Sequence, residues 1–529
     1  MVGETDSCVK LVIVHYHLRP GGIRRIIELA GPHLVRESPR PITRVVLATG
    51  QRADRRWHDR FAQQLPGVSV ETFVDRSFNY LSEQRGSPPR ITTEVRRALE
   101  QLLAGAAAGN CLVWAHNLGV GRNLLLTREL ASACAKRALP LISHHHDWWF
   151  DNRWVRWREM RRLGFRTLGA PARAVFPETY KVIHAAINHA DATILARHFG
   201  KCALWLPNLT EPAPRPTAAT VRDTRRWLRH HLAHDDAPVW LLPCRSLRRK
   251  NIAEALLLMR WLRPEAWLVV TGAASSAEEQ PYVRRLETAA HQHHWRLRLG
   301  VLAGDEAHKP GVADLLAASE AVLLTSIQEG FGLPYLEAAA ARRPLIARRL
   351  PNIAPDLDRF GFRFAQAYDD ILIAPSLFDW HAERSRQTKL YREWRAMMPF
   401  SARALVSRPL VLATKRAHPV SFSRLTLTAQ LEVLAQPVRT SWDACAPLNP
   451  ALADWRRAAS AGRLRVSPWP GGAKRWLGGE AYARRFFAAL AVRTKPGQSI
   501  FSPLEVQDDF IGHKLAAQNL YPLLWNTVT

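Results

Sequence analysis

Short runs of apolar and β-branched residues alternate with longer amphipathic stretches through the first two hundred residues. The runs predict strands at residues 10–15, 43–48, 68–73, 111–115, 141–144 and 192–195. Patterns of helical period, such as residues 23–30 and 93–104, separate them. Most of the runs are nearly continuous rather than alternating, as in strands that are buried on both faces. The succession of strand and helix therefore predicts a parallel sheet with helices on both faces.

A proline-rich segment, PNLTEPAPRP at residues 207–216, interrupts this pattern. Proline can neither donate to a strand ladder nor continue a helix, so we interpret the segment as a linker. Beyond it the pattern restarts, with strands expected at 239–242, 267–271, 321–325 and 344–347 and helices at 252–261, 278–291 and 332–341. The predicted fold class is α/β, with two doubly wound Rossmann-like domains joined by a hinge. Open sheets of this kind bind ligands at the carboxyl ends of their strands, so we expect a ligand cleft there.

The expected domains are residues 1–206 and 207–365, followed by a C-terminal extension over 366–529. The extension is rich in Trp, Arg and Pro, as in PWPGG at 468–472, and its pattern is weaker. It predicts mixed helix and loop. Residues 482–492, YARRFFAALAV, are the candidate for a helix that packs back on the N-terminal domain.

Composition excludes a disordered chain and points to anionic partners. The chain has 529 residues with 47% hydrophobic content, enough for one or two large cores. Its 74 Lys and Arg against 46 Asp and Glu give a formal charge of +28. Such a charge attracts phosphorylated small molecules, anionic lipid surfaces or nucleic acid. No helix-turn-helix, zinc-finger, RRM or KH signature is present, so we expect no specific nucleic acid partner.

Cysteine spacing and hydropathy bear on the location of the protein. The six cysteines lie far apart without a CxxC pair, which argues against a zinc knuckle, a redox motif or a secreted disulfide framework. The N-terminus lacks the basic and apolar regions of a signal peptide. No uncharged apolar stretch reaches about 18 residues, the length a membrane-spanning helix needs. We therefore expect a cytoplasmic protein, with peripheral contact to the inner face of the plasma membrane as a further expectation.

The segment with the richest chemistry is EGFGLPYLE, directly after the apolar run AVLLTS. Gly330 and Gly332 allow the backbone to approach a ligand closely. Pro334 suits the first turn of a helix, whose free amides attract phosphate. Glu337 lies about one turn into that helix, where it could reach a ribose, and Glu329 lies in the turn, where it could bind sugar hydroxyls. An ordinary strand-to-helix turn with a solvated Glu is the alternative interpretation.

Residues 326–340, SIQEGFGLPYLEAAA, resemble the donor-site signature of retaining glycosyltransferases of the GT-B fold, specifically glycosyltransferase family 4, the glycosyl transferases group 1. A second match is Arg245 and Lys250 in CRSLRRKN, where the family places an Arg and a Lys five residues apart. Here Asn251 stands where the family usually has Gly. A solvated basic loop is the alternative, and Arg248 and Arg249 are expected to be solvated or to cap a helix.

Two further matches lie in the first half of the chain. Gly21 and Gly22 follow the first strand, where the family has a Gly-Gly loop facing the donor, although a plain tight turn is the alternative. His146 and Asp147 in SHHHDWW resemble the family's His-Asp pair at a strand end. The four matches occur in the expected order, and the resemblance covers roughly residues 10–350.

The resemblance implies a GT-B fold, with an acceptor-side N-terminal domain, a donor domain and a nucleotide-diphosphate sugar as donor. Fixed cations take the place of a metal in this family, so it implies no metal and no cofactor. The residues that it implies for catalysis are His146, Glu329, Arg245 and Lys250. Those that it implies for donor binding are Gly21, Gly22, Arg245, Lys250, Gly330, Phe331, Gly332, Leu333 and Glu337.

The implied reaction transfers a sugar to an acceptor hydroxyl with retention of configuration. The acceptor attacks from the face that the diphosphate leaves, and a diphosphate oxygen takes its proton. His146 would then hold the donor sugar. Two other interpretations of residues 144–146 stay open: packing or capping, and a metal site. Adjacent residues on a strand point to opposite faces, so three consecutive histidines do not easily share one ion. The one Asp-x-Asp, Asp356 to Asp358, is expected in a loop and is a weak metal motif.

The acceptor side is expected at the strand ends of the first domain. His116 and Asn117 follow one strand, and Asp147 and Trp148 follow another, with strand-ending turns as the alternative. The indoles of Trp148 and Trp149 could stack on a sugar. The basic composition favours an anionic acceptor, such as an acidic glycan or a lipid phosphate.

The segment RWVRWREMRRLGFR at residues 153–166 places its apolar residues on one helical face between arginines. It could lie on an anionic membrane or bind an anionic acceptor. The alternative is a surface helix whose tryptophans enter the core.

Three functions remain as alternatives at this point. The leading one is glycosyl transfer from a nucleotide sugar. A glycoside phosphorylase or a nucleotide-sugar epimerase would use the same two domains. A basic nucleic-acid-binding protein, whose affinity falls steeply with salt, is the third.

Overall fold

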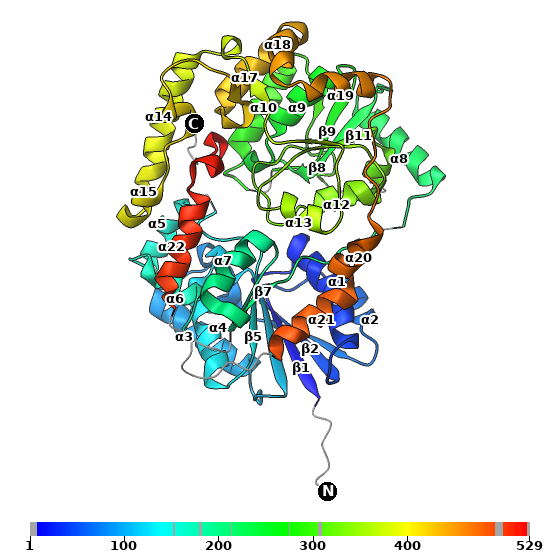
Figure 1. The fold of residues 1–529 in the computed structure, drawn as a ribbon. Helices are drawn as coiled ribbons and strands as arrows, with labels where there is room; N and C mark the ends of the chain where they lie inside the picture. The colour runs from blue at the N-terminus through cyan, green and yellow to red at the C-terminus, as the bar shows by residue number, and fades with distance from the viewer. Residues whose placement is uncertain are drawn as a thin grey trace. The chain divides into compact units, whose positions relative to one another are not determined.

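The computed structural model describes residues 8–151, 154–178, 182–212, 214–274, 276–304, 309–491 and 501–525. The chain divides into two compact units (Figure 1). The first unit comprises Met1–Glu211, Met397–Leu405 and Lys474–Lys514. The second unit comprises Pro212–Ala396, Val406–Ala473 and Leu515–Thr529. Two short segments of the C-terminal third therefore belong to the same unit as the N-terminal two hundred residues.

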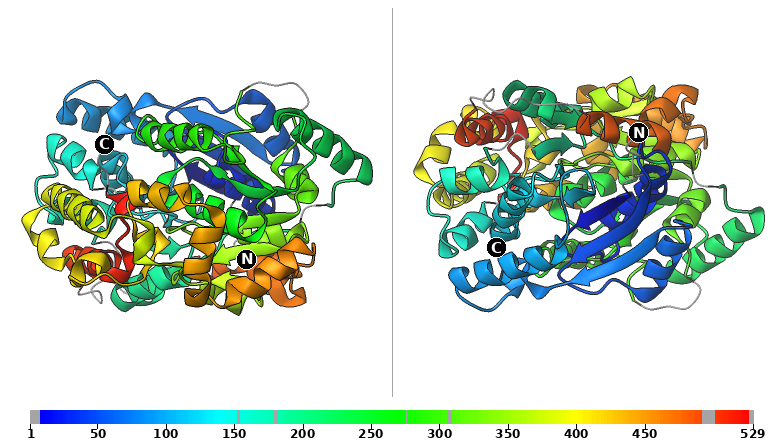
Figure 2. Two further views of the ribbon diagram at one scale, coloured as in Figure 1. Left: turned by 90° about the horizontal axis from the view of Figure 1, so that it is seen from above. Right: turned by 90° about the horizontal axis from the view of Figure 1, so that it is seen from below.

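Within the described residues, the first unit contains a parallel sheet of seven strands in the order β3-β2-β1-β4-β5-β6-β7. The strands are β1 (Val9–Val14), β2 (Ile42–Thr49), β3 (Ser69–Val74), β4 (Cys111–His116), β5 (Leu141–His145), β6 (Val182–Ala186) and β7 (Ala203–Trp205). The view from below in Figure 2 shows the twist of the blue strands. The central strands β1, β4, β5 and β6 are almost wholly buried, which explains their continuous apolar runs.

Helices lie on both sides of this sheet. They are α1 (Gly22–Arg36), α2 (Arg55–Gln63), α3 (Pro88–Leu102), α4 (Leu124–Lys136), α5 (Val155–Arg162), α6 (Gly169–Val175), α7 (His189–Phe199), α15 (Phe400–Leu405), α20 (Lys474–Leu477), α21 (Gly479–Leu490) and α22 (Pro503–Lys514). One core joins Leu11 and Ile13 of β1 to Ile26 of α1, Phe61 of α2 and Phe486 of α21. Figure 1 shows α3, α4 and α6 on the other side of the sheet. Helix α21, in the segment that the sequence singles out, packs against α1.

The second unit repeats the architecture. Among its described residues is a parallel sheet of six strands in the order β10-β9-β8-β11-β12-β13. These strands are β8 (Val239–Arg245), β9 (Trp267–Gly272), β10 (Leu297–Arg298), β11 (Ala321–Leu324), β12 (Leu345–Arg348) and β13 (Gln366–Tyr368). A short antiparallel pair, β14 (Leu372–Ile373) and β15 (Val420–Ser421), is separate. The predicted fold class, two doubly wound α/β domains, is confirmed.

The helices of the second unit are α8 (Ala218–His231), α9 (Ile252–Leu262), α10 (Gln280–Gln292), α11 (Val312–Ala318), α12 (Leu333–Ala340), α13 (Ala354–Arg359), α14 (Trp380–Ala396), α16 (Leu410–Ala413), α17 (Leu427–Ala435), α18 (Val438–Cys445) and α19 (Ala451–Ser460). Helix α9 is buried almost all round, because α17, α18 and α19 pack against it. This arrangement explains why its sequence is apolar on every face. These three helices of the C-terminal third therefore complete the core of the second unit.

Most of the predicted elements are confirmed, and one strand is wrong. Residues 192–195 lie in α7, whose N-terminus is capped by the side chain of Asn188 accepting from the Asp191 amide at 2.8 Å. A run of four apolar residues does not by itself distinguish a strand from a buried helical turn. The strand at this place is β6, VIHAA, where a histidine interrupts the apolar run.

The arginine-rich segment 153–166 forms α5, with Arg153 outside the described residues. Its apolar side chains Trp154, Trp157 and Met160 are each at most 4% exposed. Trp157 stacks on Trp149 with ring centroids 6.2 Å apart. The membrane-surface interpretation is therefore wrong, and the alternative of a surface helix whose tryptophans enter the core is confirmed. In the described part of the chain, no helix combines the length and the apolarity needed to span a membrane.

Candidate active site

A cluster of charged side chains lies at the carboxyl ends of β8 and β11, which are neighbours in the second sheet. The loop after β8 contains a short 3-10 helix, η5 (Arg248–Lys250), and the loop after β11 carries Glu329. The hydroxyl of Thr325 donates to the carbonyl oxygens of Lys250 and Asn251 at 2.9 and 3.1 Å. The amide of Ile327 donates to the Arg249 carbonyl at 2.9 Å. These bonds hold the two loops side by side.

Glu329 is the centre of this cluster. Its Oε1 forms an ion pair with the ammonium of Lys250 and accepts from the Ser326 hydroxyl at 2.7 Å. Its Oε2 accepts from Arg249 Nη1 at 3.0 Å. The structure thus joins the predicted residues Lys250 and Glu329 directly. It also adds Arg249, which the sequence interpretation placed in solvent or at a helix cap. We call Arg249, Lys250 and Glu329, together with Ser326, the donor-loop cluster.

The neighbouring positive charges, rather than burial, determine the ionisation of Glu329. Burial alone would raise its pKa, but Lys250 and Arg249 outweigh burial and hold the pKa at about 2. The carboxylate is therefore ionised at any physiological pH. Nearby, burial raises the pKa of the Cys244 thiol to about 12, and the charges of Lys250, Glu329, Arg249 and Arg245 also act on it. Three cations thus surround the end of β8 against one carboxylate. Arg245 is the last residue of β8, and its side chain is exposed.

Asn251, which stands where the family usually has Gly, adopts a backbone conformation that glycine favours. It has a left-handed conformation with φ of 47° and is fully buried. Asn is among the residues that tolerate this region best after Gly. Its side-chain amide donates to Glu254 at 2.8 Å, and Glu254 is held by Arg348 with two bonds of 2.6 Å. The substitution therefore leaves the loop that carries Lys250 in place.

Helix α12 begins beside the cluster, as the sequence predicts. Gly332 precedes it with φ of 86°, and a Cβ there would lie 3.0 Å from Tyr335 and 3.1 Å from Ile353, so only glycine fits easily. Glu337, one turn on, has an exposed side chain. Phe331 instead points inward, 6% exposed and packed near Phe360. Any donor contact at Phe331 would therefore come from its backbone.

Gly330 and Leu333 are the remaining predicted residues of this segment. Gly330 and Leu333 are half-buried at the entry to α12. Asn352 donates from its side-chain amide to the Glu329 carbonyl at 2.8 Å, which ties this turn to the loop after β12. The segment from Glu329 to Gly332 is therefore fixed at both ends.

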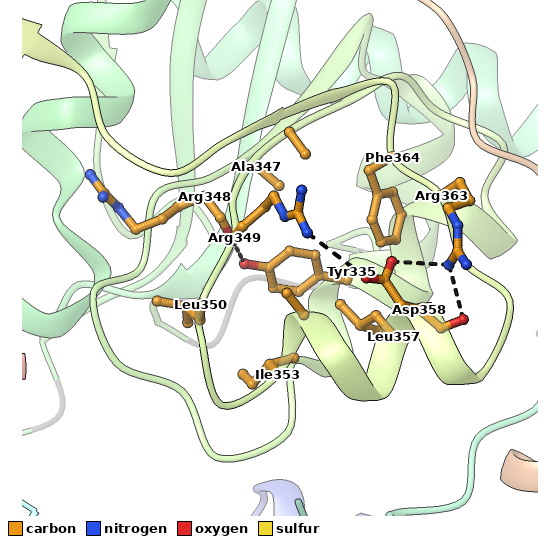
Figure 3. Close-up of a pocket in the computed structure, with 12 residues that line it drawn as sticks. Tyr335, Ala347, Arg348, Arg349, Leu350, Ile353, Leu357, Asp358, Arg363 and Phe364 are labelled. Carbon is orange, nitrogen blue, oxygen red and sulfur yellow. Dashed lines mark hydrogen bonds and ion pairs between the residues drawn. The ribbon is translucent and has the colours of Figure 1, made fainter. Parts of the chain in front are cut away.

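A small pocket lies behind α12, on the side of Tyr335 (Figure 3). It measures about 120 Å³ and is lined by Tyr335 and by residues of β12, α13 and the turn that follows. Sites for small molecules commonly measure about 300–1,000 Å³, so this pocket is too small for a nucleotide sugar. Asp358 on its rim is paired with Arg363 at 2.9 Å.

The Asp-x-Asp sequence does not form a metal loop. Asp356 and Asp358 both lie in α13, and the expectation of a loop is wrong. Asp356 is 4% exposed, while Asp358 is paired with Arg363 and, at 3.8 Å, with Arg349. Residues two apart on a helix do not face each other, so this Asp-x-Asp is not arranged as a metal motif.

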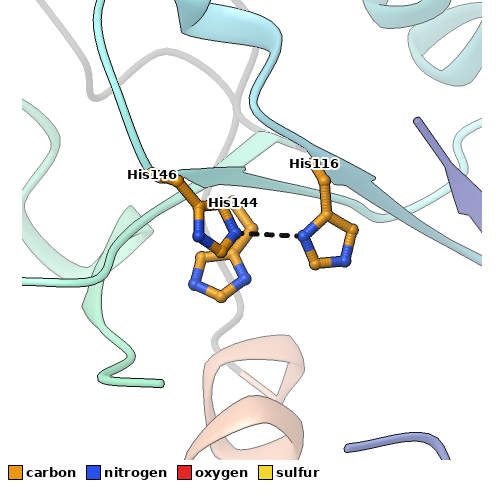
Figure 4. Close-up of side chains that lie close together, drawn as sticks. All are labelled: His116, His144 and His146. Atoms are coloured by element: carbon orange, nitrogen blue, oxygen red, sulfur yellow. Dashed lines mark hydrogen bonds between the residues drawn. The ribbon is translucent and has the colours of Figure 1, made fainter. Parts of the chain in front are cut away.

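In the first unit, the predicted residues gather at the carboxyl ends of β4 and β5. His116 and His144 are register partners on these strands, and His146 follows β5 (Figure 4). His116 Nδ1 lies 3.1 Å from His146 Nε2. Asn117 is left-handed with φ of 60°, and its side-chain oxygen accepts from the amides of His146 and Asp147 at 3.3 and 3.0 Å. The strand-end turns thus bring His116, Asn117, His146 and Asp147 together.

The interpretation of Trp148 and Trp149 as a sugar-stacking platform is wrong. Their exposed fractions are 1% and 0%. The Trp148 indole donates to Asp191 at 2.8 Å and packs on Phe510, with ring centroids 4.5 Å apart. Trp148 therefore belongs to the core of the first unit rather than to an acceptor surface.

Gly21 and Gly22 form the start of α1, with Gly21 as its cap residue. Both are exposed, and a Cβ built on Gly22 would meet nothing within 4 Å. No acidic side chain lies in the first turn of this helix. The helix end therefore leaves open space and amide groups for an anion, and contact with a donor at Gly21 and Gly22 stays a prediction.

Comparison with known proteins shows that part of the second unit matches a family model. Residues 223–357 match the family model of Glycosyl transferases group 1. The Mannosylglucosyl-3-phosphoglycerate synthase of Petrotoga mobilis is 26% identical over 294 residues, which are 54% of this chain and 55% of that protein. The chain thus spans about half the length of this curated relative.

Two solved structures are similar at lower identity. HepE of Anabaena in complex with UDP has 15% identity and a TM-score of 0.48, covering 92% of this chain and 99% of its own. The catalytic domain of Starch Synthase IV from Arabidopsis thaliana, bound to ADP and acarbose, has 15% identity and a TM-score of 0.47, covering 86% and 99%. The family model, by contrast, spans Arg245, the donor-loop cluster and Glu337. Residues 223–357 of this chain are therefore a group 1 glycosyltransferase domain.

Proposed function

We propose that the chain is a retaining glycosyltransferase, which moves a sugar from a nucleotide-diphosphate sugar to an acceptor hydroxyl without a metal ion at the diphosphate. The observation that carries the proposal is the donor-loop cluster, in which Lys250 and Arg249 meet Glu329 inside the segment that matches the family model.

The excess of positive charge suits a departing diphosphate. Cleavage of the bond between sugar and phosphate leaves negative charge on the nucleoside diphosphate. Arg245, Arg249 and Lys250 surround the end of β8, and Lys250 and Arg249 share the single negative charge of Glu329. Lys250 is 7% exposed, so its charge acts in a poorly solvated place where it stabilises an anion more strongly than in water. The free amides at the start of α12 add to this field.

The ionisation of Glu329 bears on the proton that the acceptor loses. A general base works best when its pKa lies near the operating pH. The pKa of Glu329 is held at about 2, because Lys250 and Arg249 outweigh the effect of burial, and this makes it a poor base. This supports a reaction in which a departing diphosphate oxygen accepts the proton while the acceptor attacks from the same face. Glu329 then orients Lys250 and accepts hydrogen bonds from sugar hydroxyls.

The proposal assigns the other predicted residues to the two substrates. Glu337, exposed on α12, binds the ribose hydroxyls of the donor. His146 holds the donor sugar, with burial lowering its pKa to about 4, so that it acts as a neutral hydrogen-bonding group. The acceptor is proposed to be anionic, in keeping with the charge of +28. The name of the Petrotoga relative contains a phosphoglycerate, which agrees with a phosphorylated acceptor.

The test is a search for nucleoside diphosphate release. Purified protein is incubated with UDP-, GDP- and ADP-sugars, with and without phosphorylated acceptors, and the released diphosphate is measured. The proposal expects release from one donor class, stimulated by an acceptor. If the protein instead cleaves a glycoside only when inorganic phosphate is added, the phosphorylase alternative holds and the transferase proposal is wrong.

A further inference from the structure

The three histidines at the ends of β4 and β5 form an unusual buried group. His116, His144 and His146 each offer a ring nitrogen, and these atoms lie within 4.8 Å of one another (Figure 4). His116 and His144 are buried, whereas His146 is half-buried. Among the described residues, this is the one group of three or more His, Cys, Asp or Glu whose ligand atoms lie so close.

The strand geometry explains how the group forms. Side chains two residues apart on a strand share a face, so His144 and His146 point the same way while His145 points to the other. His145 accordingly pairs with His184 at 3.1 Å on the opposite side. His116 is the register partner of His144 on the neighbouring strand and supplies the third ring. Three consecutive residues of a strand cannot easily bind one ion, because their side chains alternate between the two faces. His116, His144 and His146 are not consecutive, so this restriction does not apply to them.

Hydrogen bonding fixes the tautomer of one ring and leaves lone pairs unused. His144 Nε2 lies 3.3 Å from the Leu206 carbonyl, so it must carry the proton and donate. The Nδ1 of His144 is then a bare lone pair, and it has no hydrogen-bond partner among the described residues although it is buried. A backbone carbonyl that fixes the tautomer in this way is typical of histidines that bind metal.

The spacing of the ring nitrogens suits a metal ion. Two imidazole ligands of a tetrahedral zinc, at about 2.0–2.1 Å each, lie about 3.3 Å apart. The 3.1 Å between His116 Nδ1 and His146 Nε2 is close to this value.

We propose that His116, His144 and His146 bind one divalent transition-metal ion, with Zn²⁺ as the preferred ion. Neutral imidazoles suit Zn²⁺, and three of them leave a fourth position open to water or another ligand. The half-buried His146 gives that position access from solvent. This site belongs to the first unit, and metal binding there does not require that the proposed glycosyl transfer be correct. If both hold, the ion and the donor sugar compete for His146, and added Zn²⁺ inhibits transfer.

The experiment titrates Co²⁺ and then Zn²⁺ into the full-length protein after treatment with a chelator. We expect one equivalent of Co²⁺ to bind with the visible absorption of a tetrahedral site, and Zn²⁺ to displace it. His146→Gln, at the half-buried position, should weaken Co²⁺ affinity by about 100-fold, since each lost ligand removes a metal–nitrogen bond. His230→Gln, on the exposed end of α8, is the matched control and should leave the stoichiometry and affinity unchanged.

A measurement on the unaltered protein keeps the test independent of variant folding. X-ray absorption of the Zn²⁺-loaded protein should show three imidazole nitrogens at about 2.0–2.1 Å. Fewer than three imidazoles, no bound equivalent, or a Co²⁺ affinity that His146→Gln leaves unchanged would each overturn the proposal.

Discussion

The donor-loop cluster and the histidine group both bury polar side chains, but they differ in the charge of those side chains. The donor-loop cluster of the second unit buries ions, because Glu329 is paired with Lys250 and Arg249. The histidine group of the first unit buries neutral rings, which lie tilted against one another, and His116 lies at hydrogen-bond distance from His146. Both lie at the carboxyl ends of neighbouring parallel strands. The same fold position can thus hold either fixed charge or uncharged lone pairs.

This difference determines how each site responds to acid. A paired carboxylate resists protonation until the pH falls well below its ordinary range. A buried neutral histidine resists protonation too, but the unfolded chain gains the proton near pH 6.5. Acid should therefore weaken the first unit in a range where the donor-loop cluster is unchanged.

The largest expected effect is this loss of stability in the first unit below about pH 6.5. Below this pH the histidines of the unfolded chain bind protons, whereas the buried histidines of the folded unit stay neutral. Each such histidine therefore lowers the free energy of unfolding by about 1.4 kcal/mol per pH unit. Burial is the main cause of the lowered pKa at every one of these positions, which are His15, His116, His144, His145, His146 and His184. The loss of stability accumulates as the pH falls from 6.5 to 5, and above pH 6.5 it fades.

Amide hydrogen exchange of β4 and β5, corrected for the intrinsic effect of pH and with chelator present, would measure this loss. Peptides of the loop after β11 are the internal control. The pKa of Glu329 is lowered to about 2 because its cations outweigh burial, so the stability from this carboxylate is lost only as the pH falls from about 4.5 toward 2. Equal loss of protection in both units between pH 6.5 and 5 would contradict the comparison.

The second effect, in size, is on turnover. Lys250→Ala removes a buried cation from the proposed leaving-group site, and we expect kcat to fall about 100-fold or more. Lys389→Ala, an exposed lysine of α14, should retain activity within about twofold and serves as the control. Steady-state release of nucleoside diphosphate measures both. Undiminished kcat in a folded Lys250→Ala variant would remove this lysine from the chemistry.

A smaller effect is expected for the donor alone. Glu337→Gln keeps the size of the exposed side chain but weakens its hydrogen bonds to ribose hydroxyls, so the donor Kd should rise about tenfold. The neighbouring exposed Arg342→Gln, beyond the end of α12, would change it little. Calorimetric titration with the active nucleotide gives both values. An unchanged Kd in Glu337→Gln would count against the ribose role.

The smallest effect tests the core position of an aromatic residue. Trp148→Phe should alter the KM of each substrate by less than about twofold, because the indole is 1% exposed and cannot touch a ligand. Its thermal midpoint should fall, since Asp191 loses a buried partner at 2.8 Å. A large rise in acceptor KM with an unchanged thermal midpoint would restore the sugar-stacking interpretation.

The sequence predicts those parts of the molecule that local chemistry determines. Continuous apolar runs mark the buried strands β1, β4 and β8, and Gly332 with Pro334 marks the start of α12. The pair of Lys250 and Glu329 is predictable in the same way, because each follows a strand end and the strands are parallel.

The sequence does not predict those features that depend on contacts between distant segments. Nothing in the string SLRRK shows which base faces Glu329, since the loop after β11 makes that choice. Trp148 is buried by Asp191 and Phe510, which lie far along the chain. The sequence predicts a strand in the apolar turn of α7 and misses β6, whose apolar run is interrupted. Runs of four or five residues are too short for their periodicity to distinguish a strand from a helix.

We propose that Lys250 and its neighbours bind the diphosphate of a nucleotide sugar, and a thermal shift with UDP, GDP and ADP measures this binding without any acceptor. A ligand that binds only the folded protein raises Tm, by an amount that follows from its concentration and Kd. We expect one of the three diphosphates to raise the Tm of the wild-type protein and to lose most of that effect in Lys250→Ala. Shifts of equal size in both proteins, or no shift with any of the three, would contradict the claim.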